Sequence, residues 1–114
     1  MTEKDPPINE NWSELTSVDK LIHEPARLAA LTILDAVESA DFLYLQKATG
    51  LTKGNLSVHL QKLEESGLIE IQKTFQGKYP RTICKLTMKG KLAFGEYKEQ
   101  MRSILGNDNT ALRT

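Results

Sequence analysis

The sequence of 114 residues predicts a mainly α-helical α+β domain with one small β-hairpin. Apolar residues recur at intervals of three and four over most of the chain, which is the period of a helix that buries one face. The pattern changes to alternation between residues 69 and 86, where Gly77 and Pro80 supply a turn. The length suits one hydrophobic core, and 39% hydrophobic and 26% charged residues are typical of a globular domain.

The chain divides into a folded body and two polar ends. Residues 1–11 contain two prolines and no periodicity, so we expect a flexible N-terminal tail. Residues 12–105 form the predicted domain, and residues 106–114 are expected to fray. We expect a cytoplasmic protein, because no apolar run reaches the ~18 residues of a membrane span and the start lacks the apolar stretch of a signal peptide.

Two helical segments are expected before residue 39. Trp12, Leu15 and Ile22 share one helical face, and this first segment must end before Pro25, because proline disfavours helical geometry at the preceding residue. Pro25 then suits the first turn of a second helix, whose apolar stripe runs through residues 28–37.

Two further helices follow a break at residues 39–41. Asp41 is a candidate N-cap for a helix of about two turns, which Gly50 ends because glycine enters left-handed geometry without steric cost. Thr52 is the expected N-cap of the next helix. Its apolar face is made of leucines at spacings of four and three, namely Leu56, Leu60 and Leu63.

A hairpin and a last helix complete the pattern. Residues 69–75 and 81–86 alternate in polarity, and residues 76–80 between them have the composition of a turn. Thr87 is the expected N-cap of the last helix, whose long apolar stripe needs a partner surface.

The charges are polarised, although the formal net charge of the chain is zero. Residues 1–46 carry nine acidic and three basic side chains, a net charge of −6. Residues 47–91 carry nine basic and three acidic side chains, a net charge of +6. A basic half of this kind suggests a polyanionic partner.

Two helices joined by a tight turn at residues 49–52, with a basic hairpin after them, predict a winged helix-turn-helix. Residues 45–52, 56–64 (LSVHLQKLE) and 67–69 (GLI) resemble the winged-helix transcriptional regulators related to the MarR and ArsR families. Weaker similarity extends from about residue 19 to residue 105. The resemblance implies a winged helix with N- and C-terminal dimerisation helices, double-stranded DNA as partner, and a recognition helix that begins at residue 52.

The exposed side chains of that helix suit contact with DNA. Asn55 and Gln61 can each pair with adenine through the amide, and Val58 can touch a thymine methyl group. In the hairpin, Arg81 is expected to insert into a groove and Lys78 to meet phosphate. The expected DNA-binding residues are Thr52, Lys53, Gly54, Asn55, Ser57, Val58, His59, Gln61, Lys62, Lys73, Lys78 and Arg81.

The resemblance also implies that the terminal helices pair two subunits, which would set two recognition helices about 34 Å apart. The expected dimer interface consists of Trp12, Leu15, Phe94, Tyr97, Met101, Ile104 and Leu105. The alternative is that these stripes fold back onto the domain's own core. A crevice between the terminal helices and the core could accept a small-molecule effector, as MarR-like relatives suggest, and the sequence does not identify one.

No enzyme, cofactor or metal site is expected. Ser57 and His59 are two apart on a helix and point in different directions, which argues against a nucleophile and its base. Cys84 is the single cysteine, so the paired cysteines of ArsR-type metal sensors are missing, and its alternation with Thr82 and Leu86 predicts a buried thiol. We therefore expect a homodimeric, sequence-specific transcriptional regulator. The alternative is a winged helix that binds another protein and no DNA.

Overall fold

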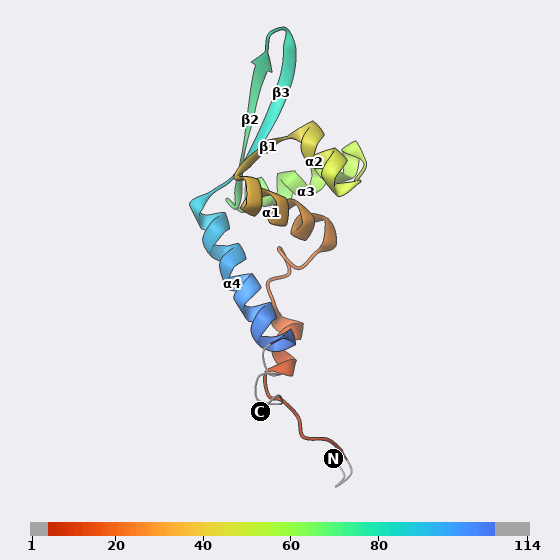
Figure 1. The fold of residues 1–114 in the computed structure, drawn as a ribbon, viewed down its shortest axis with the longest axis vertical. Helices are drawn as coiled ribbons and strands as arrows, with labels where there is room; N and C mark the ends of the chain where they lie inside the picture. Colours follow the sequence, from red (N-terminus) through yellow and green to blue (C-terminus); the bar gives the residue numbers. More distant parts are fainter. Residues whose placement is uncertain (1–4, 107–114) are drawn as a thin grey trace.

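The computed structural model of the protein describes residues 5–106, so most of the predicted C-terminal tail and the first four residues of the N-terminal tail lie outside the described residues (Figure 1). The elements follow in the order η1 (Trp12–Ser17), α1 (Pro25–Val37), β1 (Ser39–Asp41), α2 (Phe42–Thr49), α3 (Lys53–Glu65), β2 (Ile69–Gln76), β3 (Tyr79–Leu86) and α4 (Met88–Leu105). This is the predicted α+β winged helix. Within the described residues, no helix is long and apolar enough to cross a membrane.

The N-terminal segment differs from the expected helix. Only a short 3-10 helix, η1, forms, and the backbone of Val18 is already extended. Hydroxyl groups in η1 donate to nearby carbonyls, among them Thr16 Oγ1 to Ser13 O at 2.8 Å, and such bonds compete with an α-helix. Asp19 then accepts a bond from the N–H of Leu21. The predicted helix to residue 22 is therefore wrong.

The residues at which α1, α2 and α3 begin and end agree with the sequence pattern. Glu24 is extended and its Oε1 accepts the N–H of Arg27 at 2.8 Å, which caps α1 ahead of Pro25. Asp41 and Thr52 cap α2 and α3 in the same way. Gly50 adopts a left-handed φ of 72° at the C-terminus of α2.

The core lies where α1, α2 and α3 meet the sheet. Ile22 and one face each of α1 and α3 are fully or almost fully buried. The most buried apolar side chains of these helices are Ala30, Leu31, Leu34, Leu45, Leu56, Leu60 and Leu63. The three leucines of α3 therefore lie in the core as the spacing predicted, which fixes the face that α3 presents to solvent.

The antiparallel sheet has three strands in the order β1-β3-β2. Strand β1 was not predicted, because three residues are too short to show alternation. Strands β2 and β3 pair from Ile69↔Leu86 to Gln76↔Tyr79, which leaves a two-residue loop of Gly77 and Lys78. Gly77 has a φ of 64°, as such a loop requires, so the turn is shorter than the predicted 76–80.

The start of α4 is fixed by Thr87. Its Oγ1 accepts the N–H of Gly90 at 2.9 Å and lies 2.6 Å from Gly67 O, to which it can donate. Its N–H donates to Leu68 O at 3.0 Å. Gly90 packs so closely that an added Cβ would lie 2.0 Å from Leu68 O.

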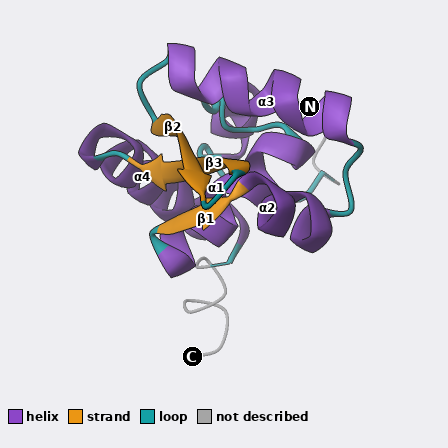
Figure 2. Ribbon diagram, turned by 90° about the horizontal axis from the view of Figure 1, so that it is seen from above, coloured by secondary structure: helices purple, strands orange, loops and turns teal. Residues whose placement is uncertain are grey.

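Helix α4 leaves the body on the side away from the hairpin, and η1 lies beside its C-terminal half (Figure 1). Seen from above, the strands lie in the middle of the projection, with α3 along one side and α2 and α4 at opposite ends (Figure 2). The molecule therefore has the hairpin at one end and the paired terminal segments at the other.

Candidate nucleic-acid interface

The outward face of α3 carries small and polar side chains. Because its leucines are buried, this helix exposes Lys53, Gly54, Asn55, Ser57, Val58, Gln61 and Lys62, with Thr52 exposed at its N-cap. An added Cβ at Gly54 would meet nothing within 4 Å, so the backbone of the first turn is open to a ligand. The exposed N-terminus of a helix favours negative charge.

His59 is half-buried and faces α1. Its Nδ1 lies 3.2 Å from a terminal nitrogen of Arg27 and 3.7 Å from Glu24 Oε1. Because arginine only donates, Nδ1 accepts this bond. The structure thus places His59 at the contact between α1 and α3.

The same contact sets the ionisation of Glu24. Burial raises its pKa, but the backbone N–H of Arg27, the charge that His59 carries when it is protonated and the charge of Arg27 outweigh that effect and hold the pKa below the usual 4.5. The carboxylate form of the α1 cap is therefore favoured in the folded protein.

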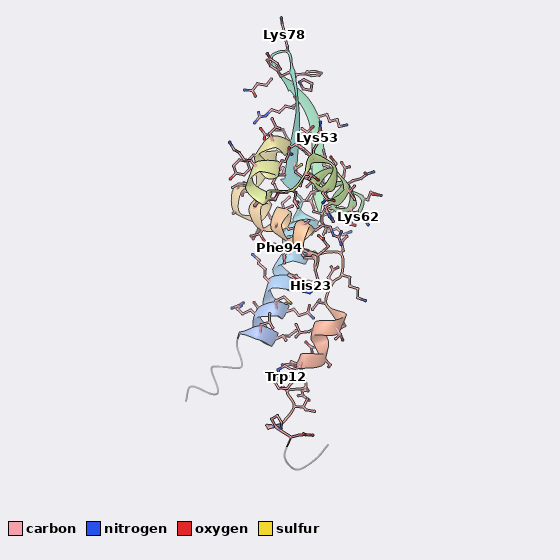
Figure 3. The ribbon with its side chains drawn as sticks, turned by 90° about the vertical axis from the view of Figure 1, so that its right-hand side faces the viewer. Trp12, His23, Lys53, Lys62, Lys78 and Phe94 are labelled. Atoms are coloured by element: carbon pink, nitrogen blue, oxygen red, sulfur yellow. The ribbon has the colours of Figure 1, made fainter. Side chains whose placement is uncertain are left out.

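The hairpin of β2, Gly77, Lys78 and β3, called the wing below, places its cations at different heights. Lys78 lies at the tip (Figure 3). Lys73, which pairs with Thr82, is exposed further from the tip. Arg81, which was expected to insert into a groove, is paired with Asp41, with its Nε and Nη2 at 3.3 and 3.2 Å from Asp41 Oδ2. The other oxygen of Asp41 caps α2 through the N–H of Tyr44. One carboxylate therefore joins the wing to α2.

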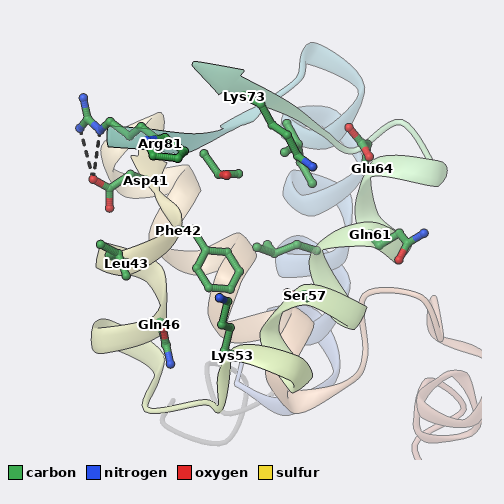
Figure 4. A pocket seen from close by; sticks show the side chains of 14 residues that line it. Asp41, Phe42, Leu43, Gln46, Lys53, Ser57, Gln61, Glu64, Lys73 and Arg81 are labelled. Carbon is green, nitrogen blue, oxygen red and sulfur yellow. Dashed lines mark hydrogen bonds and ion pairs between the residues drawn. The ribbon is translucent and has the colours of Figure 1, made fainter. Parts of the chain in front are cut away.

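A groove of about 740 Å³ lies between α2, α3 and the wing (Figure 4). Lys53, Ser57 and Gln61 of α3 lie on its helical side. The wing contributes Ile71, Lys73, Pro80, Arg81 and Thr82, and the start of α2 contributes Phe42, Leu43 and Gln46. Lys53 of α3 and Lys73 of the wing thus line one concave surface, together with the carboxylates of Glu64 and of Asp41, which pairs with Arg81.

Several residues of this region were not predicted from the sequence. Asp41 was recognised as a cap but not as the partner of Arg81, which is 40 positions away. Phe75 and Tyr79 were not singled out, yet they are 70% and 77% exposed near the wing tip. The length of the hairpin could have indicated that these two side chains are exposed, because the outer half of the hairpin extends beyond any helix that could cover it.

The residues expected at a dimer interface fall into two groups. Phe94, Tyr97 and Ile104 are buried within the chain itself, and Leu15 and Met101 are half-buried. Trp12 and Leu105 remain 48% and 61% exposed. The inner face of α4 therefore packs against its own chain, as the alternative of self-packing expected. Trp12 and Leu105 leave apolar surface exposed beside that face.

Comparison with known proteins places this geometry in a family. Residues 26–105 match the family described as winged helix DNA-binding domain. An uncharacterized protein of Methanocaldococcus jannaschii is 40% identical over 88 residues, which cover 77% of this chain and 96% of that protein.

Two solved structures share the architecture. A transcriptional regulator homologue from Pyrococcus horikoshii OT3 is similar with a TM-score of 0.77 and 27% identity, over 85% of this chain and 95% of that chain. A putative MarR-family transcriptional regulator from Enterococcus faecalis V583 is similar with a TM-score of 0.72 over 99% of this chain and all of that one, and at 16% identity it shows the fold alone.

Proposed function

The chain belongs to the winged helix DNA-binding domain family, and on this basis we propose that it is a sequence-specific transcriptional regulator that binds duplex DNA as a homodimer. The observation that carries the proposal is the groove in which the exposed face of α3 and the cations of the wing meet. A major groove about 12 Å wide admits an α-helix, and a hairpin beside that helix reaches the neighbouring backbone.

Each part of the surface has a distinct role in this proposal. Asn55 and Gln61 read base edges, because an amide forms two hydrogen bonds with adenine. Lys53, Lys62 and Lys78 neutralise phosphates, which fixes the position of the protein without reading the sequence. His59 acts through α1 and holds the angle of α3.

The homodimer rests on the apolar surface left exposed along the terminal segments. Trp12, Leu92 and Leu105 are each about half or more exposed, although they flank a well-buried helix face. A second copy that covers this surface by two-fold symmetry would present two α3 helices to one side of DNA. Sedimentation at micromolar concentration should give twice the monomer mass, and a single species of 12.8 kDa would overturn the dimer.

Fluorescence-detected titration into random-sequence duplex DNA at two salt concentrations tests DNA binding. Neutralised phosphates make affinity fall steeply with salt, and loss of one contact lowers the slope by about 1. We expect Lys62→Ala and Lys78→Ala each to lower this slope. Arg102→Ala, in the last turn of α4 far from the wing, is the matched control and should leave it unchanged.

Selection from a random library then tests sequence readout. Wild type should enrich a defined site, and Asn55→Ala should relax the preference at one position by about 1–3 kcal/mol. If folded wild type binds no duplex even at low salt, the regulator is rejected and a protein-binding winged helix takes its place.

A further inference from the structure

The tip of the wing carries apolar side chains that the fold does not use. Phe75 is 70% exposed and stands directly opposite Pro80, which is also exposed. Tyr79 is 77% exposed and stands opposite Gln76. Only the loop of Gly77 and Lys78 lies beyond these pairs.

The two aromatic side chains lie on opposite faces of the wing. Successive residues of a strand alternate between faces, so Phe75 and Pro80 share the face of Lys73 and Thr82. Lys73, Pro80 and Thr82 line the groove together with Ser57 and Gln61 of α3. The pair of Phe75 and Pro80 thus continues the face of Lys73 and Thr82 toward the tip, whereas Tyr79 lies on the opposite face of the wing.

Packing within the hairpin does not account for this exposure. A cross-strand aromatic pair stabilises a sheet by about 0.2–1 kcal/mol, but it does so by covering surface, and here most of the Phe75 side chain stays in solvent. Exposed apolar residues on a two-stranded projection also favour aggregation. Their presence at the tip indicates a surface that is covered in a complex.

The charges around the tip identify the partner. Lys73 shares the face of Phe75 and Lys78 lies at the tip, whereas Arg81 is on the opposite face and paired with Asp41. No acidic residue occurs from position 71 to position 95 of the sequence. Duplex DNA offers a partner to both the apolar and the cationic side chains of the tip, because its apolar stacked bases lie between two rows of negatively charged phosphates. Phenylalanine and proline are both used as wedges between base steps, where they unstack the bases and kink the duplex.

Resting on the proposed function, we infer that Phe75, backed by Pro80, is a wedge that enters duplex DNA from the minor groove next to the groove read by α3. Unstacking costs free energy that depends on the base step, so the wedge adds a preference for deformable steps such as TA and CA. The wing tip then selects sequence without hydrogen bonds to bases.

A duplex with a defect tests this inference, because a step that is already unstacked costs less to open. The probe is a 30-base-pair duplex of fixed sequence, either fully paired or with one central mismatch, in low salt. We expect wild type to bind the mismatched duplex about tenfold more tightly. Phe75→Ala should lose this preference while keeping the salt dependence, since it removes no charge.

Two variants control for damage to the wing. Tyr79→Ala removes an equally exposed aromatic ring from the other face and should keep the preference for the mismatch. Phe75→Leu retains an apolar side chain at the same position and should keep most of the preference for the mismatched duplex. Far-ultraviolet circular dichroism of all three variants should match wild type.

The outcomes separate this inference from the proposed function. If wild type binds both duplexes equally and Phe75→Ala binds as wild type does, the wedge is rejected and DNA binding stands. If wild type binds neither duplex, the proposed function and the wedge both fail. If Phe75→Ala instead changes the sedimentation of the free protein, the tip serves self-association and the wedge is overturned.

Discussion

His23 Nδ1 lies 2.6 Å from Tyr97 Oη, a hydrogen bond between residues 74 positions apart. The two rings are also in tilted contact at 5.9 Å, and Tyr97 stacks on Phe94 at 6.2 Å. This cluster attaches the segment before α1 to the middle of α4. Burial raises the pKa of Tyr97, so its hydroxyl stays protonated and can take part in the bond.

Removal of this hydroxyl should loosen the attachment. We expect Tyr97→Phe to lower the free energy of unfolding in urea by about 1 kcal/mol, because His23 loses a partly buried partner. Tyr44→Phe is the control, since Tyr44 is 51% exposed, and should change stability little. Equal effects of the two substitutions would contradict a structural role for the bond.

The junction of α4 with the wing should tolerate no side chain at Gly90. An added Cβ would lie 2.0 Å from Leu68 O and 2.8 Å from Leu86 Cδ1, so Gly90→Ala should destabilise the protein by about 2–3 kcal/mol. Gly95→Ala in the same helix meets nothing within 4 Å and should stabilise by about 0.5–1 kcal/mol, because alanine loses less entropy in a helix. Thermal unfolding of both variants checks the opposite signs.

The cap of α1 should make stability depend on acid pH. The pKa of Glu24 is lowered in the folded protein, so its contribution is present above the usual 4.5 and is lost as the pH falls through the folded value. We expect Glu24→Gln to lower the free energy of unfolding by about 1 kcal/mol at pH 7. Urea unfolding of both proteins at a series of pH values should show this difference shrinking as the pH falls below the usual 4.5.

Cys84 should be unreactive while the protein is folded. Burial, with a smaller effect of the carboxylates of Glu64 and Asp41, raises the pKa of this thiol from 9.0 to about 11, which lowers the thiolate fraction roughly a hundredfold. At pH 8 a thiol reagent such as dithionitrobenzoate should modify it slowly, and quickly after unfolding in urea. Rapid modification of the native protein would show that the strand opens.

Local signals predicted the helix boundaries well, because a cap depends on neighbours within four residues. Asp41, Gly50, Thr52 and Thr87 all act as their residue types suggested. The predicted N-terminal helix failed for an equally local reason, since the hydroxyls of residues 13–17 bond to their own backbone.

The parts of the site that the sequence could not predict depend on distant contacts. Whether Arg81 is free or paired depends on Asp41, which the pairing of β1 with β3 brings beside it. The burial of Phe94 and Tyr97 likewise depends on how the segment before α1 crosses α4. Periodicity identifies an apolar face but does not say whether the same chain or another copy covers it.

The junction at Thr87 makes α4 a lever. Its first turn is hydrogen-bonded to the backbone between α3 and β2, and from there 18 helical residues extend for ~27 Å away from the body. A tilt of about 5° at the junction moves the far end by about 2 Å. Conversely, a contact made at that far end would fix the direction in which α3 and the wing are aimed, so the geometry of the surface proposed to bind DNA is coupled to the opposite end of the molecule.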